Sequence, residues 1–462
     1  MKRQRLDGAC LHPVGAWPLL GGEEMREVVG RLPPERGEVG TTLLAAARLA
    51  ACAAWLQSAP LARAVEREAW AALHCGAWRD VERAWRGVYM AAAHYASAAE
   101  CAIALDESSP STSPNHSPSC RSVYLQALRT IDLGLMLGDH TFRKPLLLAA
   151  KLLEDRLASE EGSVPPAPVP LPSLPPAQTR ATSVRPLSGV LPSLPVFRLP
   201  SLPFFYNECM LPSRPALLTH LTDSWPARRE RRWSDLTYLK AAAGHRTVPV
   251  EVAEHYLDPQ FDEHLMTLSE FIEKYIEHPP AIGRKGYLAQ HQLFDHLPRL
   301  RADVEIPDYC ALSLEESESE DGEGISEGSQ HDQSQRDQRA SHSPQEVVRI
   351  NAWFGPAGTL SPLHQDRYHN LLAQVFGSKY VRLYAPTEEN CRCLYPHESG
   401  PHKISSQIVD PDHVDSARFP LFGDALYVDL LLREGDVLYI PPFWWHFIES
   451  CETSFSVSFW WI

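Results

Sequence analysis

The sequence predicts an α+β protein with a separate all-α N-terminal domain and a β-rich C-terminal domain. Residues 41–157 are rich in Ala, Leu, Arg and Glu, and their apolar residues recur at helical spacing. After about residue 347, apolar or alternating runs separated by Gly and Pro dominate, which is typical of strands and turns. A chain of 462 residues is long enough for two or three such domains.

The N-terminal domain is assigned to residues 1–158. Helical spacing predicts helices at 61–73, 81–104 and 122–137. Stacked antiparallel helices, in an arrangement similar to a tetratricopeptide array, would bury one stripe: Trp85, Val88, Ala92 and Tyr95. No clean repeat is present. Packing of these helices on one another explains the pattern at least as well as a docking role, and the sequence identifies no partner.

Two segments are predicted to lie outside the packed domains. Residues 159–193 form a Pro-rich linker, because prolines such as Pro165 and Pro166 favour extended polyproline conformation. Residues 314–345 consist mainly of Glu, Ser, Asp and Gln, and they are predicted to form a disordered acidic insertion. The insertion interrupts the C-terminal domain, which is assigned to residues 194–462. Within that domain, residues 268–278 are predicted to form a helix.

Composition limits the classes of function. A net charge of −15 argues against direct binding of nucleic acid and suits basic segments of protein substrates. The longest apolar stretch, residues 43–56, is too short to cross a bilayer, so no membrane association is expected. Ten cysteines without a Cys-x-x-Cys pair predict reduced thiols in an intracellular protein without structural zinc.

The motif His364-Gln365-Asp366 is the strongest sign of chemistry. Residues two apart on a strand project from the same face, so His364 and Asp366 can chelate one ion. His446, about 80 residues later, can supply a third ligand. Two imidazoles and one carboxylate occupy one face of an octahedral Fe(II) and leave positions open for a co-substrate and oxygen.

Two alternatives bear on this motif. A second His-x-Asp, His413-Val414-Asp415, lies in a polar turn-like stretch and is interpreted as a solvated loop. An isolated His446 would be explained as a core histidine packed among neighbouring aromatic residues. The turn and short apolar strand before His446, and the alternating strand after it, favour the metal ligand instead.

Four further segments carry a resemblance to a known family: 286–295, 351–356, 361–366 and 455–461. Their sequences, among them Asn-Ala-Trp-Phe-Gly-Pro and Ser-Pro-Leu-His-Gln-Asp, resemble those of the JmjC-domain oxygenases. The resemblance implies a double-stranded β-helix, which is a jelly-roll, cupin-like JmjC domain, that uses Fe(II), 2-oxoglutarate and O2. The chain departs from the pattern at Arg367-Tyr368-His369, where a Pro-Gln-Gln run is typical, so the rim of the metal pocket is expected to differ.

The resemblance also implies roles for individual residues. The catalytic metal ligands are His364, Asp366 and His446. Lys379 would bind the far carboxylate of 2-oxoglutarate, although without the metal motif it would be interpreted as a surface lysine in a turn. Further contacts to the co-substrate are expected from Tyr287, Trp353, Ser361 and Asn370. A wall that excludes water is expected from Trp353, Val375, Val457 and Phe459.

Substrate contacts are expected from Glu251, Phe261, Gln290 and Trp353, although Glu251 is explained equally well as a strand residue that faces solvent. A carboxylate and aromatic faces suit a guanidinium, which favours hydroxylation of arginine in protein substrates. The alternative is demethylation of methyl-lysine in histone H3 tails, with an aromatic cage of Tyr287, Trp353 and Trp444. Metal-dependent cleavage of methylated histone tails ranks third, and a non-catalytic reader is the fourth hypothesis. Chromatin and cell-cycle roles and a nuclear, or also cytoplasmic, location are implied by the resemblance.

Overall fold

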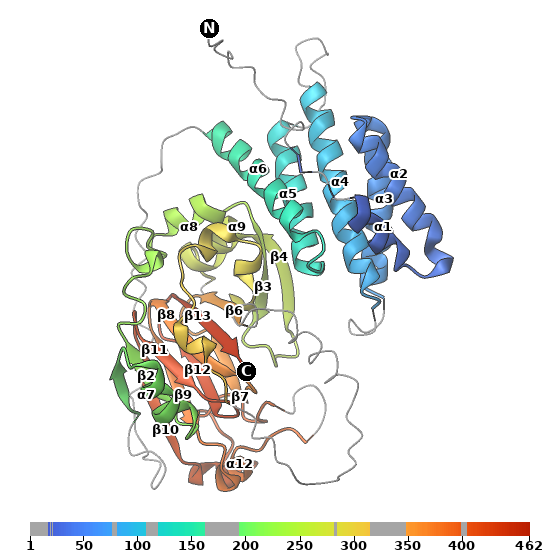
Figure 1. The fold of residues 1–462 in the computed structure, drawn as a ribbon. Helices are drawn as coiled ribbons and strands as arrows, with labels where there is room; N and C mark the ends of the chain where they lie inside the picture. Colours follow the sequence, from blue (N-terminus) through green and yellow to red (C-terminus); the bar gives the residue numbers. More distant parts are fainter. Residues whose placement is uncertain are drawn as a thin grey trace. The chain divides into compact units, whose positions relative to one another are not determined.

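The computed structural model describes residues 17–18, 20, 22–75, 81–107, 119–161, 194–280, 284–314, 348–398 and 404–462. The chain forms two compact units (Figure 1). One consists of Met1–Pro166 with His245–Thr247, and the other of Ala167–Gly244 with Val248–Ile462. Most of the predicted Pro-rich linker and of the predicted acidic insertion lies outside the described residues. No helix among the residues described is long and apolar enough to cross a membrane.

The first unit is helical, as predicted. Its helices are α1 (Gly22–Gly30), α2 (Gly37–Ala51), α3 (Trp55–Leu73), α4 (Ala84–Glu107), α5 (Cys120–Leu137) and α6 (Arg143–Glu161). From α2 to α6, each helix packs against the next one in the chain. The predicted stripe is buried, and in α4 burial extends around the helix, which marks α4 as the centre of the unit. The tetratricopeptide-like arrangement stays a prediction.

A buried ion pair completes the helical unit. Arg246 donates from Nε and Nη2 to the carboxylate of Asp132 at 2.9 and 2.6 Å. The backbone N–H of Thr247 donates to the same carboxylate. The Arg246 side chain is 1% exposed and that of Asp132 is fully buried, so neither charge has water as a substitute partner.

The second unit is built on two sheets, which confirms the predicted jelly-roll. The larger sheet has the strand order β1-β2-β11-β8-β13-β6-β5-β3-β4, and the smaller has the order β10-β9-β12-β7. The strands of the larger sheet are β1 (Val196–Arg198), β2 (Ala216–Thr219), β3 (Thr247–Ala253), β4 (Asp262–Thr267), β5 (Lys285–His291), β6 (Arg349–Gly355), β8 (His369–Phe376), β11 (Val437–Ile440) and β13 (Ser454–Trp461). Those of the smaller sheet are β7 (Leu360–Gln365), β9 (Lys379–Tyr384), β10 (Tyr427–Leu432) and β12 (Trp445–Ser450).

Short helices accompany the larger sheet. They are α7 (Leu202–Phe205), α8 (Leu236–Ala243), α9 (Leu268–Phe271) and α10 (Pro298–Arg301), with α12 (Glu388–Cys393) before β10. The predicted helix 268–278 is α9 continued by the π-helix Ile272–Glu277, and it starts at a capping box of Thr267 and Glu270. Helices α7 to α10 cover one face of the larger sheet, whose other face lines the site described next, whereas α12 packs with residues of the smaller sheet.

The sequence of residues 371–384 alone predicts a single strand, but these residues belong to two strands, β8 and β9, which lie in different sheets. Gly377 turns the chain between them with φ +72°. A Cβ at this position would lie 2.3 Å from the carbonyl oxygen of Thr453, so only glycine fits. The turn delivers Lys379 to the start of β9.

Candidate metal centre and co-substrate pocket

Strand pairing brings the three predicted metal ligands together. His364 on β7 and His446 on β12 are direct partners across the antiparallel pair. Asp366 follows the last residue of β7, and its Oδ2 lies 3.8 Å from Nε2 of His364 and 3.6 Å from Nε2 of His446. One ligand atom from each residue lies within 4.8 Å of the other two. A single ion can therefore contact all three residues.

Backbone carbonyls orient both imidazoles. Nδ1 of His364 donates to the carbonyl oxygen of Pro362 at 2.7 Å, and Nδ1 of His446 donates to that of Trp444 at 2.9 Å. Each hydrogen bond places the proton on Nδ1 and leaves the Nε2 lone pair facing the centre. Burial lowers the pKa of His446 to about 4, and the neighbouring His364 adds to this effect. His446 is thus neutral, as a metal ligand must be.

The donor set fits Fe(II). Oδ2 of Asp366 is buried without a hydrogen-bond donor, which is unfavourable for a carboxylate oxygen unless a cation binds there. Two imidazoles and one carboxylate are the ligands of non-haem Fe(II) oxygenases. Among the residues that the structure describes, this is the one His/Cys/Asp/Glu cluster with metal-binding geometry. The second motif is a loop as predicted, with His413 exposed and bonded to Asp410.

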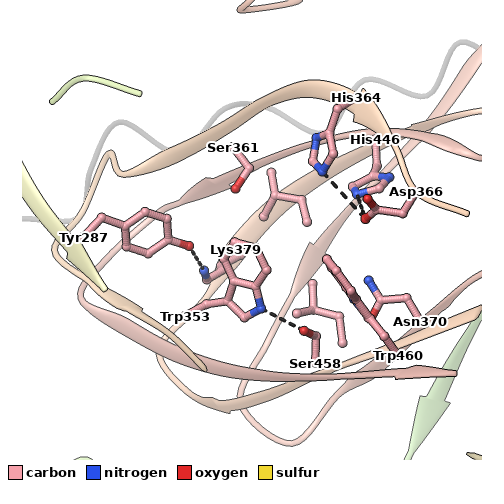
Figure 2. Close-up of a pocket in the computed structure, with 12 residues that line it drawn as sticks. Tyr287, Trp353, Ser361, His364, Asp366, Asn370, Lys379, His446, Ser458 and Trp460 are labelled. Atoms are coloured by element: carbon pink, nitrogen blue, oxygen red, sulfur yellow. Dashed lines mark hydrogen bonds and ion pairs between the residues drawn. The ribbon is translucent and has the colours of Figure 1, made fainter. Parts of the chain in front are cut away.

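The metal centre opens into a pocket between the two sheets (Figure 2). The smaller sheet contributes residues from β7, β9 and β12, and the larger sheet contributes residues from β5, β6, β8 and β13. The pocket contains all of the predicted metal and co-substrate residues. Its lining is Tyr287, Trp353, Ser361, His364, Asp366, Asn370, Leu372, Lys379, His446, Ile448, Ser458 and Trp460.

Lys379 is a buried cation without an acidic partner. Its side chain is 2% exposed, and Nζ donates to the hydroxyl of Tyr287 at 3.0 Å. No carboxylate in the described part of the chain forms an ion pair with it, and burial lowers its pKa to about 7. A carboxylate entering the pocket would restore its charge, because the two opposite charges stabilise each other in a site with little water. The far carboxylate of 2-oxoglutarate has this chemistry.

The larger sheet supplies polar contacts beside Lys379. The indole Nε1 of Trp353 donates to Oγ of Ser458 at 2.9 Å, which fixes the ring as a wall of the pocket. Oδ1 of Asn370 is buried without a hydrogen-bond partner. Ser361 lies in the lining close enough to Tyr287 to hydrogen-bond with its hydroxyl. Tyr287 on the larger sheet and Ser361 and Lys379 on the smaller sheet can therefore donate to an anion with several oxygens.

The predicted apolar wall was wrong in three of its four residues. Val375, Val457 and Phe459 face the hydrophobic core on the opposite side of the larger sheet, because side chains alternate along a strand. Ser458 and Trp460 of β13 face the pocket instead. The apolar lining comes from Trp353 together with three residues that the sequence did not single out: Leu372, Ile448 and Trp460.

The predicted substrate residues occupy different positions. Glu251 on β3 is the cross-strand partner of Tyr287, so both side chains lie on the same face of the sheet. Burial raises the pKa of Glu251 to about 7, and the nearby Glu263 adds to the rise. Phe261 is 38% exposed and Gln290 is exposed with φ +46°; like Glu251, neither is part of the pocket lining, and Trp353 is the one predicted substrate residue found there. Their contact with substrate stays a prediction.

The expected methyl-lysine cage is incomplete. Tyr287 and Trp353 are neighbours in the pocket, with ring centroids 6.3 Å apart. Trp444 is buried in an apolar cluster that also contains Leu372 and packs against Trp353, and its Nε1 donates to the carbonyl oxygen of Ser213. It is not part of the pocket lining, so these three rings do not surround a common space.

Comparison with known proteins agrees with this site. Residues 201–462 match the family model described as a cupin-like domain. The chain belongs to the JmjC branch of the cupin-like proteins, and its catalytic unit is a 2-oxoglutarate oxygenase domain. This family generally uses Fe(II), 2-oxoglutarate and O2. The resemblance seen in the sequence motifs is thus confirmed.

Named relatives extend over most of the chain. It is 36% identical to zebrafish (Danio rerio) lysine-specific demethylase 8 across 87% of both chains. It is 34% identical to Jumonji C domain-containing protein 5 of Drosophila melanogaster, over 85% of this chain and 84% of the relative. A more distant relative is the human bifunctional peptidase and (3S)-lysyl hydroxylase JMJD7, 25% identical over 58% of this chain and 84% of that protein.

Proposed function

We propose that this protein hydroxylates arginine side chains in protein substrates. The observation that carries the proposal is the position of Glu251, a half-buried carboxylate beside the co-substrate pocket. Its neighbour across the strands, Tyr287, contacts Lys379 inside the pocket. A guanidinium can satisfy both oxygens of such a carboxylate with two parallel N–H donors, which an ammonium group cannot do.

Tyr256 relates Glu251 to the metal centre. Its ring packs edge-on against His364, with centroids 6.3 Å apart, and its hydroxyl hydrogen-bonds to Ser405. Burial raises the pKa of the Tyr256 hydroxyl, and the carboxylates of Asp366 and Glu251 add to the rise. Tyr256 therefore lies near both carboxylates, so a side chain bound by Glu251 can direct a C–H bond toward the metal.

When bound, iron, 2-oxoglutarate and O2 supply oxidative decarboxylation of the co-substrate and transfer of one oxygen atom to a C–H bond. The residues of the chain bind the metal, the co-substrate and the substrate, and orient them for this reaction. His364, Asp366 and His446 would hold the metal, while Lys379, Tyr287 and Asn370 would hold the co-substrate. The ring of Trp353 and the side chains of Leu372 and Ile448 exclude water from the reacting groups. Which C–H bond reacts is decided by how the substrate is placed.

Demethylation of methyl-lysine is the second candidate, favoured by the name of the zebrafish relative. The same pocket chemistry, acting on an N-methyl group, would release formaldehyde. Glu251 could then hold the ammonium as a single charge. Metal-dependent cleavage of histone tails ranks third, because no general base in a His-Glu-x-x-His pattern is present in the sequence. A non-catalytic reader ranks last, because a reader does not need a complete metal triad and a buried Lys379.

Mass spectrometry of peptides separates these candidates. Arginine-containing and methyl-lysine-containing peptides are incubated with the full chain, Fe(II), ascorbate and 2-oxoglutarate. A gain of one oxygen on arginine supports the proposal, whereas loss of methyl groups with formaldehyde supports the demethylase. Cleavage that needs no 2-oxoglutarate supports the peptidase. His446→Ala is the negative control for every metal-dependent product.

Glu251→Gln tests the observation on which the proposal rests. It keeps the size of the side chain and removes its charge, so the KM for an arginine peptide should rise while 2-oxoglutarate turnover without substrate stays unchanged. Equal use of the arginine peptide by both proteins would contradict the role of Glu251. Histone tails, chromatin and cell-cycle roles and a nuclear location are proposed on the resemblance alone. Imaging of a fluorescent fusion in cells tests the location.

A further inference from the structure

Two of the three residues that follow Asp366, Arg367 and Tyr368, extend the pocket wall outward. The ring of Tyr368 stacks on that of Trp460, with centroids 5.5 Å apart and planes 13° from parallel. Trp460 itself lines the pocket beside Asn370 (Figure 2). His369 instead is buried and hydrogen-bonds to Tyr439. Tyr368 therefore lies at the edge of the pocket, stacked on a residue that lines it.

Strand register places Arg349 at the same edge. β6, β13 and β8 are neighbours, and Arg349, Trp460 and Asn370 are paired across them. Paired residues on antiparallel strands share a face, so Arg349 lies on the pocket face. Along β6 that face runs from Trp353 in the pocket wall through Asn351 to the exposed Arg349.

Two guanidinium groups gather over one ring. The Cζ atoms of Arg349 and Arg367 lie 5.2 and 5.6 Å from the centroid of Tyr368. Both arginines are exposed. The ring attracts each cation and holds both guanidinium groups at one place on the pocket edge, where their N–H donors can bind an added anion.

We propose that Arg349 and Arg367 bind an acidic side chain of the protein substrate, close in its sequence to the residue that enters the pocket. This inference rests on the proposed function, since it assumes a protein substrate. Guanidinium groups bind carboxylates through directed pairs of N–H donors, so the site selects sequence context rather than only net charge. The residues Arg349, Tyr368 and Arg367 are called the arginine rim below.

Direct binding tests the arginine rim without turnover. Two labelled peptides share a central arginine and differ only in flanking residues, Asp in one and Asn in the other. Fluorescence anisotropy is measured on the full chain with Mn(II) and 2-oxoglutarate. The Asp peptide should bind about fivefold tighter, as expected of two exposed ion pairs, and the preference should fall at high salt. Equal affinities overturn the proposal.

Charge reversal assigns the preference to residues. The double variant Arg349→Glu with Arg367→Glu should lose the preference for the Asp peptide. The milder double variant Arg349→Gln with Arg367→Gln should lose this preference too, and it provides the test if the first variant misfolds. Arg433→Glu changes an exposed arginine outside the pocket lining and should keep it. A preference that survives in both double variants overturns the assignment.

Kinetics separate the arginine rim from other roles. In the double variants the KM for the Asp peptide should rise about fivefold, while kcat and the KM for 2-oxoglutarate stay unchanged. A raised KM for 2-oxoglutarate would assign the two charges to co-substrate entry and overturn the proposal. A preference for the Asp peptide that appears only after deletion of residues 315–345 would also overturn the proposal. In that case the two arginines bind acidic residues of the chain itself.

The two proposals can fail separately. If neither peptide is hydroxylated but the Asp preference in binding depends on Arg349 and Arg367, arginine hydroxylation fails and the arginine rim stands. If both peptides are hydroxylated equally by the wild type and by both double variants, the proposed function stands and the arginine rim fails.

Discussion

Raising the pH should weaken the binding of 2-oxoglutarate, because Lys379 loses its proton near neutrality. Burial lowers the pKa of Lys379 to about 7, whereas lysine in an unfolded chain titrates at about 10.4. The charged fraction is therefore about 0.9 at pH 6, 0.5 at pH 7 and 0.1 at pH 8. Since the co-substrate dianion prefers the charged form, its affinity should fall about tenfold from pH 6 to pH 8 and tenfold more by pH 9.

Calorimetric titration of 2-oxoglutarate into the full chain measures this effect, with saturating Mn(II) at every pH. His446 does not interfere, because its pKa of about 4 lies below the range. Glu251 does interfere, because its pKa of about 7 lies within the measured pH range. Its negative charge at high pH would also repel the co-substrate. Glu251→Gln should keep most of the slope, and Lys379→Met should bind weakly at every pH without a slope. A flat wild-type profile from pH 6 to pH 9 would refute the reasoning.

The same pKa shift affects folding. A lysine whose pKa is lower in the folded state binds fewer protons there than in the unfolded chain, so stability should rise with pH between about 7 and 10.4. The charge of the buried Lys379 destabilises the folded state most below pH 7, where the side chain is protonated. Bound 2-oxoglutarate should remove this dependence near neutrality, because it keeps Lys379 charged.

Three further predictions concern the metal centre and the two units. His364→Ala, Asp366→Ala and His446→Ala should each lower turnover at least about 100-fold without changing the circular dichroism, and normal turnover in any of them would contradict the metal site. Asp132→Ala should destabilise the helical unit by about 1.5–3 kcal/mol in denaturant titration, because the buried Arg246 loses its fully buried partner and keeps only Glu154, 3.5 Å away; a loss under about 1 kcal/mol would show that the ion pair with Asp132 matters little. Gly377→Ala should destabilise the catalytic unit by about 1–3 kcal/mol, whereas Gly423→Ala, whose Cβ meets nothing within 4 Å, is the matched control; equal stabilities would refute the steric argument.

The metal centre could be predicted from the sequence because its chemistry is local. His364 and Asp366 are two residues apart, and few ions suit two imidazoles and one carboxylate. Their meeting with His446 depends on the pairing of β7 with β12, which the sequence does not determine by itself. The family resemblance supplied that pairing.

The lining of the pocket was harder to predict, because a shift of one residue exchanges the two faces of a strand. On β13 the apolar Val457 and Phe459 were assigned to the pocket, but they face the larger core, and the small Ser458 faces the pocket. A clue was present in the sequence. Trp353 was expected in the pocket, and its indole donates a hydrogen bond to Ser458. This pairing shows that Ser458 faces the pocket, but it can be recognised only once β6 and β13 are aligned.

Both histidine ligands are held by carbonyl oxygens of the main chain, those of Pro362 and Trp444. Every residue type carries this acceptor, so substitutions at positions 362 and 444 leave the orienting hydrogen bonds available as long as the strands keep their path. The side chains at positions 362 and 444 are therefore not needed to orient the metal ligands. The residues around the centre can therefore vary, and with them what is recognised at the entrance, without loss of the metal site.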